Sequence, residues 1–342
     1  MNDLSQLSIL VTCFNKSTYI KEFFSNLSLL LALSAEVVIV DDCSTDGSGA
    51  LLESSLASFP NVLFLKSKEN LGSAASRNRT LAAATRPYLI FWDIDDFLNV
   101  DILQKMLNEV LEKEGDLCRG YFSIQPSNQI NEEILEPSSQ DSSISHFSHL
   151  IAKRMGYWRY IYRREFIHSN SFAFTPTFSD LGGRRFILDD VFWMIQVASA
   201  SGKIVFTRQQ APLYHYTAAK DTTRSWKSFQ SQAKLFPLAS LIFIKDISRY
   251  ELDTEIAHTL LYEKLQEHLR YLNIFQWLQV LPKTLQLLTI MKSRLPEQKF
   301  PLYSTLFRTG INALKNFYVD LRSKIDRKST RLNSSHEWIS RM

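Results

Sequence analysis

Short apolar runs alternate with helix-like stretches over about the first hundred residues, and this alternation limits the fold more than any other feature. Four runs have the length and apolar character of buried strands: residues 7–12, 37–40, 62–65 and 88–92. The segments between them read as helices over residues 15–33, 48–58 and 73–84. Strands that alternate with helices form parallel pairs, and the helices pack on the sheet. The sequence therefore predicts an α/β, Rossmann-like fold with a mostly parallel sheet and helices on both faces.

Charge is distributed unevenly along the chain, which bears on its partners. Residues 1–120 carry 10 basic and 16 acidic side chains, whereas residues 221–342 carry 19 and 11. A nucleic-acid-binding protein usually places its basic residues on the folded core, so we expect no nucleic-acid partner. The three cysteines (Cys13, Cys43 and Cys118) cannot all pair, and the chain opens without the pattern of a signal peptide. We therefore expect a cytoplasmic protein with reduced thiols.

Polar clusters follow three of the predicted strands. Residues 12–15 follow the first strand, Asp41 and Asp42 the second, and residues 93–96 (Asp-Ile-Asp-Asp) the fourth. The carboxyl ends of parallel strands meet at one edge of the sheet, where ligands bind. Three neighbouring carboxylates repel one another and lose solvation, and a divalent cation such as Mg²⁺ or Mn²⁺ would offset both costs. The alternative is a solvated loop in which Asp96 caps a helix.

Four sequence blocks together resemble family 2 glycosyltransferases of the GT-A fold. The blocks follow one another in the family's order: SILVTCFN (8–15), VIVDDCSTDGS (38–48), NLGSAASRN (70–78) and YLIFWDIDD (88–96). The chain lacks both the GxGxxG of dinucleotide dehydrogenases and the GxxxxGK[ST] of P-loop hydrolases. The resemblance implies an inverting hexosyltransferase with a nucleotide-sugar donor, UDP-linked, and a Mg²⁺ or Mn²⁺ cofactor.

The resemblance also implies roles for individual residues. Donor-binding roles fall on Thr12, Phe14, Asn15, Asp42, Arg77, Asp93 and Asp95. Among them Phe14 would stack on uracil, Asp42 would accept a hydrogen bond from the uracil N3–H, and Arg77 would lie by the nucleotide or its phosphates. Asp95 and Asp96 are the implied metal ligands, and Asp95 would also contact the ribose. How the three strand-end aspartates divide these tasks is left open.

The second half of the chain matches the family in fewer places. Residues 188–193 (LDDVFW) resemble the block that supplies the catalytic base, with Asp189 in place of a glutamate and Asp190 aligned with the base. An inverting transfer needs one carboxylate to deprotonate the acceptor hydroxyl. The alternative is that the pair caps a helix over residues 191–200. His215 would either approach the diphosphate or be buried with its hydrogen bonds satisfied.

We predict four segments along the chain. Residues 1–124 would bind the nucleotide-sugar donor, and residues 125–220 would form the acceptor-binding half with the catalytic base. Residues 125–149, rich in Ser, Asn, Gln and Glu, read as a loop. Residues 221–327 would form a helical C-terminal region, with one face made by Leu261, Leu265, Leu269 and Leu272. Residues 328–342 resemble translated vector sequence and are excluded from the fold prediction.

The resemblance points to a glycan or lipid-linked acceptor in the synthesis of a bacterial capsule, lipopolysaccharide or other surface polysaccharide. Basic residues interleave with Leu, Phe and Tyr over residues 226–324, which suits either peripheral contact with the inner membrane or a solvated helix face. Two alternatives remain. A nucleotidyltransferase would carry a Gly-rich basic loop after the first strand, and residues 12–16 form none. A catalytically inactive nucleotide- or carbohydrate-binding module would not need both acidic clusters.

Overall fold

The computed structural model forms two compact units. It describes residues 3–57, 59–125, 129–130, 156–177, 179–182, 188–200, 202–209, 211–217, 226–247, 254–293, 310 and 312–313. Met1–Asp221 and Ile242–Ala257 form the first unit, and Thr222–Leu241 and His258–Met342 form the second. Among the described residues, no helix combines the length and the apolar character needed to span a bilayer.

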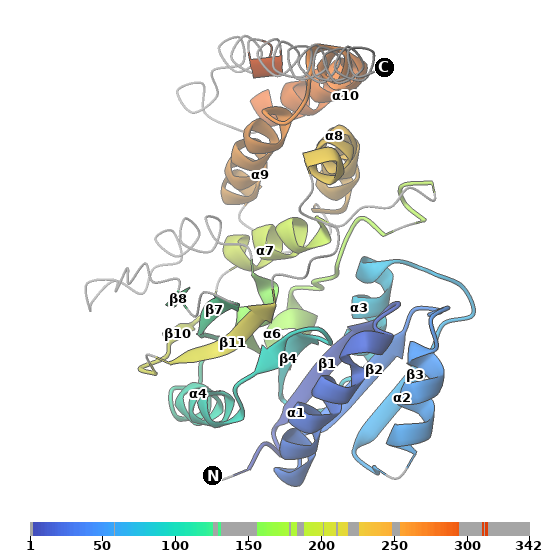
Figure 1. Ribbon diagram of the computed structural model, residues 1–342. Coiled ribbons are helices and arrows are strands. Elements are labelled where there is room, and N and C mark those ends of the chain that lie inside the picture. Colours follow the sequence, from blue (N-terminus) through green and yellow to red (C-terminus); the bar gives the residue numbers. More distant parts are fainter. Residues whose placement is uncertain are drawn as a thin grey trace, which may run out of the picture. The chain divides into compact units, whose positions relative to one another are not determined.

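A seven-stranded sheet in the order β10-β6-β9-β4-β1-β2-β3 forms the centre of the first unit (Figure 1). Its parallel half contains β1 (Leu7–Cys13), β2 (Glu36–Asp41), β3 (Val62–Lys66) and β4 (Tyr88–Asp93). The other half contains β6 (Leu117–Arg119), β9 (Tyr160–Arg163) and β10 (Ile204–Phe206). Only β9 runs antiparallel to its neighbours in the described sheet. The mostly parallel sheet confirms the predicted fold class.

Helices cover both faces of this sheet. On one face lie α1 (Ile20–Ala32), α2 (Ser48–Leu56) and α4 (Val100–Glu112). Because side chains alternate between the faces of a strand, every second strand residue joins these helices in one core. Members of that core include Ile9, Ile39, Ile90, Leu27, Leu52 and Leu103. On the opposite face, α3 (Ser73–Ala83) packs against β1 and β2 (Figure 1).

The helix predicted from residue 15 begins later than expected. Asn15 adopts a left-handed backbone with φ of 54°, and a 3-10 turn, η1 (Ser17–Tyr19), precedes α1. Asparagine tolerates this conformation better than most residues, because its short polar side chain bonds locally. Here its Oδ1 accepts a hydrogen bond from the Thr45 amide at 2.8 Å. Residue 15 therefore ties the loop after β1 to the loop after β2.

A second, four-stranded sheet has the order β5-β11-β7-β8. Its strands are β5 (Phe97–Leu98), β7 (Tyr121–Gln125), β8 (Gln129–Ile130) and β11 (Pro212–Thr217). The predicted loop over residues 125–149 is therefore wrong at its start, where β8 pairs with β7 and supplies backbone partners along the edge of that strand. Residues 131–149 lie outside the described part of the chain.

Aromatic side chains form the core beside β4 and β9. The helix α7 (Asp189–Ser199) contributes Trp193, which is fully buried and stacks on Phe174 at a centroid distance of 4.3 Å. Both rings meet Phe91 of β4 edge-on. The turn η2 (Tyr157–Arg159) and the helix α6 (Arg164–Ser169) flank β9. This packing fixes α7 against the sheet, and Trp92 and Trp193 are both buried in the core.

The C-terminal region is helical, as the leucine spacing predicts. Its helices are α8 (Trp226–Ile247), α9 (Thr254–Leu269) and α10 (Ile274–Lys292). The predicted leucine face is buried at all four positions: Leu261, Leu265, Leu269 and Leu272. Within the second unit the His268 ring stacks on Phe236 at 4.2 Å. Residues 328–342 lie outside the described part of the chain.

Candidate active site

The predicted polar clusters meet at the carboxyl edge of the parallel strands. In the sheet register, Cys13 lies opposite Asp41, and Thr12 lies opposite Asp93. The Asp42 amide donates a hydrogen bond to the Cys13 carbonyl at 2.8 Å, which extends the pairing beyond the strand end. The structure thus brings Thr12 and the residues after it beside both aspartate clusters. Phe14, in the loop that follows β1, is half-buried.

Asp42 holds the loop that precedes α3. Its carboxylate is buried and accepts hydrogen bonds from the backbone amides of Leu71 (2.9 Å) and Gly72 (2.8 Å). Gly72 has a φ of 84°, a left-handed conformation that favours glycine. A carboxylate has about four acceptor positions, so these two bonds leave capacity for a base edge. The assignment of Asp42 to uracil stays a prediction.

The carboxylates after β4 lie on a tight turn. The Asp96 amide donates to the Asp93 carbonyl at 3.1 Å, and the Asp96 carbonyl accepts from the Trp92 indole at 3.0 Å. The following helix, α4, is capped by Asn99, whose side chain accepts from the Ile102 amide. The interpretation of Asp96 as a helix cap is therefore wrong, because Asn99, three residues later, caps the helix. The close spacing of Asp93, Asp95 and Asp96 therefore has to be explained in another way.

Two of these carboxylates have charged partners. The Lys16 ammonium lies 2.5 Å from the Asp95 carboxylate, and the Tyr157 hydroxyl donates to both Asp93 oxygens at 3.0 and 3.2 Å. The Arg77 guanidinium is 3.8 Å from Asp93. Burial raises the pKa of Asp93, and the Arg77 charge opposes this effect. Burial is the largest effect on Lys16 and favours its neutral form, but the charge and hydrogen bond of Asp95, together with the Asp93 charge, raise the lysine pKa overall.

The described residues contain no group of three or more His, Cys, Asp or Glu side chains arranged to hold a metal ion. Asp95 and Asp96 offer hard oxygen ligands at one turn, and Asp96 is only 9% exposed. A divalent cation bound there would need further ligands from a bound molecule or from water. Mg²⁺ binds in this way, through one or two carboxylates and the oxygens of substrate phosphates.

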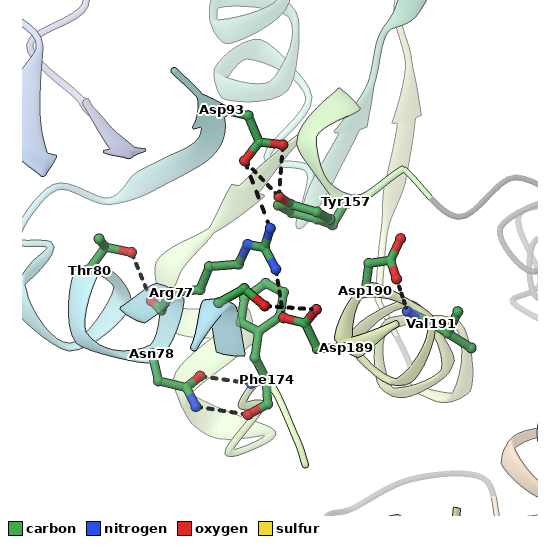
Figure 2. Close-up of polar contacts among 10 residues, drawn as sticks. Arg77, Asn78, Thr80, Asp93, Tyr157, Phe174, Asp189, Asp190 and Val191 are labelled. Atoms are coloured by element: carbon green, nitrogen blue, oxygen red, sulfur yellow. Dashed lines mark hydrogen bonds and ion pairs between the residues drawn. The ribbon is translucent and has the colours of Figure 1, made fainter. Parts of the chain in front are cut away.

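The two acids at the start of α7 have different surroundings (Figure 2). Asp189 is 1% exposed and accepts hydrogen bonds from Arg77 at 2.6 Å and from the Ser73 hydroxyl at 3.3 Å. Asp190 points away from Arg77 and accepts a hydrogen bond from the Val191 amide at 2.9 Å. Burial and the Asp189 charge raise the pKa of Asp190 to about 7, and Arg77 opposes the shift.

The capping interpretation of this pair is not borne out. Residue Leu188 occupies the N-cap position of α7, and Asp189 and Asp190 lie inside the first turn. Negative charge in the first turn suits the helix dipole, so the pair also stabilises the helix. A cap alone would not place one carboxylate against a guanidinium and leave its neighbour with a pKa near neutrality.

Sequence reasoning missed three members of this site. Tyr157 holds Asp93 through its hydroxyl, and the Arg77 guanidinium carbon lies 4.5 Å from the centre of its ring. The Asp93 amide donates to the Tyr214 hydroxyl at 3.0 Å, and Lys16 pairs with Asp95. Aromatic residues beside basic ones over 157–164 were a usable signal for Tyr157. Nothing local to Lys16 indicates a partner 79 residues away.

His215 fits the interpretation as a satisfied histidine. Its Nδ1 lies 2.7 Å from the Ser123 hydroxyl, and its ring lies beside Phe97 at a centroid distance of 5.4 Å. Burial lowers its pKa, which keeps the ring neutral. Among the described residues, the ring thus contacts Ser123 and Phe97 rather than the carboxylates after β4.

Comparison with known proteins identifies the family. Residues 8–192 match the family model described as Glycosyl transferase family 2. The chain belongs to this family. The sequence resemblance drawn from residues 8–96 is therefore confirmed, and the family match extends through Asp189 and Asp190 to residue 192.

Similar proteins match this family 2 member at low identity. EpsH of Bacillus subtilis (strain 168) is 26% identical over 215 residues, which cover 61% of this chain and 60% of EpsH. A crystal structure of S. aureus TarS 1–349 with UDP-GlcNAc has a TM-score of 0.67 at 19% identity, covering 90% and 89% of the two chains. PcManGT from Pyrobaculum calidifontis, a mannosyltransferase solved with GDP-Man and Mn²⁺, has a TM-score of 0.50 at 15% identity, covering 92% and 87%. The chain shares the GT-A fold of TarS.

Proposed function

We propose that this chain is an inverting glycosyltransferase that moves a sugar from a UDP-linked donor to a hydroxyl of a glycan or lipid-linked acceptor. The observation that carries the proposal is the arrangement within the first unit: carboxylates after β4, a near-neutral carboxyl at Asp190, and Arg77 between them. The UDP-GlcNAc in the TarS structure supports a uridine donor. The product would be a bacterial surface polysaccharide, such as a capsule or lipopolysaccharide.

The donor would occupy the carboxyl edge of β1, β2 and β4. Thr12, Phe14 and Asn15 would line the nucleotide pocket, with Asp42 reading the uracil. Asp95 and Asp96 would hold Mg²⁺ or Mn²⁺. The fit is chemical: both residues offer carboxylate oxygens, the ligands that these cations prefer, and Asp95 already pairs with a cation, the Lys16 ammonium. When bound, the metal would neutralise the charge of the departing diphosphate.

Asp190 would act as the catalytic base. The acceptor hydroxyl gives its proton to the Asp190 carboxylate while its oxygen forms a bond to C1 of the sugar. The bond between C1 and the diphosphate oxygen breaks, and its electron pair leaves with UDP. Asp189 is poorly suited to this task because Arg77 and Ser73 already occupy its oxygens. A carboxyl with a pKa of about 7 is well matched to proton transfer at neutral pH.

We also propose that the enzyme works in the cytoplasm, at the inner face of the membrane if its acceptor is lipid-linked. The support is electrostatic. Residues 221–342 carry 19 basic and 11 acidic side chains, and anionic lipids attract basic segments.

A panel of nucleotide sugars tests the proposal. UDP-GlcNAc, UDP-glucose, UDP-galactose and GDP-mannose would be incubated with the chain in the presence of Mn²⁺, Mg²⁺ or EDTA, and release of free nucleotide would be measured. We expect metal-dependent release from a uridine donor, and much less release from the Asp190→Asn variant when an acceptor hydroxyl is supplied. Equal release in EDTA would remove the metal from the proposal, and no release from any donor would remove the transferase activity.

A further inference from the structure

Arg77 links the two acidic groups of the site. Its guanidinium lies 2.6 Å from Asp189 and 3.8 Å from Asp93, and it stacks over the Tyr157 ring at 4.5 Å and the Phe174 ring at 5.4 Å (Figure 2). The side chain is 13% exposed. These contacts surround the guanidinium with two carboxylates and two aromatic faces. An arginine that bound the nucleotide directly would present its fork to the donor instead.

The residue beside Arg77 reinforces the link. Asn78 pairs with the backbone of Phe174 through two hydrogen bonds, of 2.8 and 2.7 Å (Figure 2). Phe174 in turn stacks on Trp193 of α7. Two consecutive side chains of α3 therefore hold the start of α7 and the segment that packs against it. Because Asp189 is almost fully buried, removing its cationic partner Arg77 would leave a buried carboxylate without its ion pair, which is strongly disfavoured.

We propose that Arg77 is a positioning residue for the transfer step: its ion pair with Asp189 fixes the first turn of α7 and so directs Asp190 toward the acceptor. This inference rests on the proposed function, since it takes Asp190 as the base. It departs from the role that the family resemblance gives Arg77, which is contact with the nucleotide or its phosphates. The structure supplies four contacts for the positioning role, all within the chain.

The charged and titratable groups that act on Asp190 give this role a measurable consequence. They come from Asp189 on α7, Arg77 on α3, Asp93 at the end of β4, and the Tyr157 hydroxyl of η2. Arg77 is the cation among them, and it lowers the pKa of Asp190. Removing the guanidinium would raise that pKa. Because the base must be ionised, the rise of the transfer rate with pH would then move to higher pH.

The test compares Arg77→Met and Arg77→Lys with the matched control Arg79→Met. Arg79 lies on the same helix, but it bonds to Ser67 and to the Lys66 carbonyl and contacts neither acid. We expect Arg77→Met to lower kcat by about 10–100-fold while the Kd for UDP stays within about threefold of native. Its rate should recover partly at pH 8–9. Arg77→Lys should keep the native pH profile and regain part of the rate, since a point charge lacks the fork of arginine.

Loss of folding is controlled by a second variant. The double variant Arg77→Met/Asp189→Asn removes both charges of the pair, so it should melt at a higher temperature than Arg77→Met alone without recovering the native rate. If the Kd for UDP rises in step with the loss of kcat in Arg77→Met, Arg77 is a nucleotide ligand and the inference is overturned. It is also overturned if Arg77→Met transfers at the native rate.

An NMR titration separates this inference from the proposed function. The side-chain carboxyl of Asp190 would be followed with ¹³C in native protein and in Arg77→Met, with neither donor nor acceptor present. A higher titration midpoint in Arg77→Met supports the coupling even if no transferase activity is found. An unchanged midpoint contradicts it even if the enzyme is active.

Discussion

The turn after β4 and the first turn of α7 both carry dense carboxylates, but the structure treats them differently. After β4, Asp93 and Asp95 are matched with Tyr157, Arg77 and Lys16. At α7 the Arg77 guanidinium pairs with Asp189, whereas it only partly offsets the effect of burial and of the Asp189 charge on Asp190, whose pKa is raised to about 7. A group of carboxylates suits a divalent cation that carries a diphosphate, whereas a carboxyl with a pKa near neutrality suits proton transfer.

The contrast shows why neighbouring acids are not interchangeable. Asp189 and Asp190 follow each other in the chain, yet the helix turns one toward α3 and the other away from it (Figure 2). The residue that separates their properties is Arg77, which comes from a different part of the sequence. Variants of single acids can therefore test the roles of the two acidic groups separately.

The largest effect is expected from a change in the carboxylates after β4. Asp96→Ala removes one of two proposed metal ligands, and metal stabilisation of a leaving group contributes several kcal/mol, so transfer should fall by at least about 10³-fold. UDP binding should weaken as well and lose its dependence on Mn²⁺. Isothermal calorimetry with and without the metal measures both effects. Full-strength, metal-independent binding by Asp96→Ala would contradict the metal site.

The next effect is on the side of α7. Asp190→Asn keeps the size of the side chain but cannot take up a proton, so transfer should fall by about 10²–10⁴-fold. The Kd for UDP should stay within a few-fold of native, unlike that of Asp96→Ala. Asp189→Asn is the matched control and should lose less activity. If Asp189→Asn abolishes transfer and Asp190→Asn remains active, the base is Asp189.

The sequence predicted the fold and the positions of the acidic groups better than it predicted their partners. The parallel sheet, its helices and the meeting of the strand ends follow from local patterns, because a buried strand needs a run of apolar residues whatever its partners are. The positions of Asp42, Asp93 and Asp96 at one edge follow from that topology. The start of α1 was placed too early, because a 3-10 turn and the left-handed Asn15 interrupt the pattern.

The partners of the carboxylates could not be predicted in the same way. Lys16 and Asp95 are 79 residues apart, and Arg77 and Asp189 are 112 apart. No periodicity connects such pairs, since their contact depends on how α3, α7 and the loop after β1 pack on the sheet. The pKa of Asp190 depends on this packing too. The sequence identified the candidate acids but could not show that Asp190 has a raised pKa.

The buried carboxylate of Asp42 allows the proposed contact with the nucleobase to be tested as well. Asp42 accepts two backbone amides and, by our proposal, the uracil N3–H. A charge-assisted hydrogen bond contributes about 1.5–3 kcal/mol, so Asp42→Ala should weaken UDP binding by about 10–150-fold. The affinity ratio of UDP to GDP isolates the base contact from any disturbance of the loop before α3. Equal native affinities for UDP and GDP would exclude a uracil contact.

A pH profile sharpens the distinction between the two acidic groups. By our proposal the active form of Asp190 is the carboxylate, which predominates above a pKa of about 7. Transfer should therefore rise about tenfold between pH 6 and pH 8, following the ionised fraction of one group. Initial rates at saturating donor, with melting temperature as a check on folding, measure this rise. A flat profile in native protein would rule out Asp190 as the rate-limiting base.

The smallest effect concerns the cation on the side of β4. Lys16 is 32% exposed at its side chain, and its ion pair with Asp95 is screened by solvent, so Lys16→Met should change stability little. If the ammonium also helps to hold the anionic donor, UDP affinity should fall by only a few-fold, and more at low salt than at high salt. Calorimetry at two salt concentrations measures this, with the exposed Lys21→Met as control. If Lys16→Met loses as much UDP affinity as Asp96→Ala, Lys16 contributes to donor binding as strongly as the proposed metal ligands do. Its ammonium would then be a main binding group of the site and more than the ion-pair partner of Asp95.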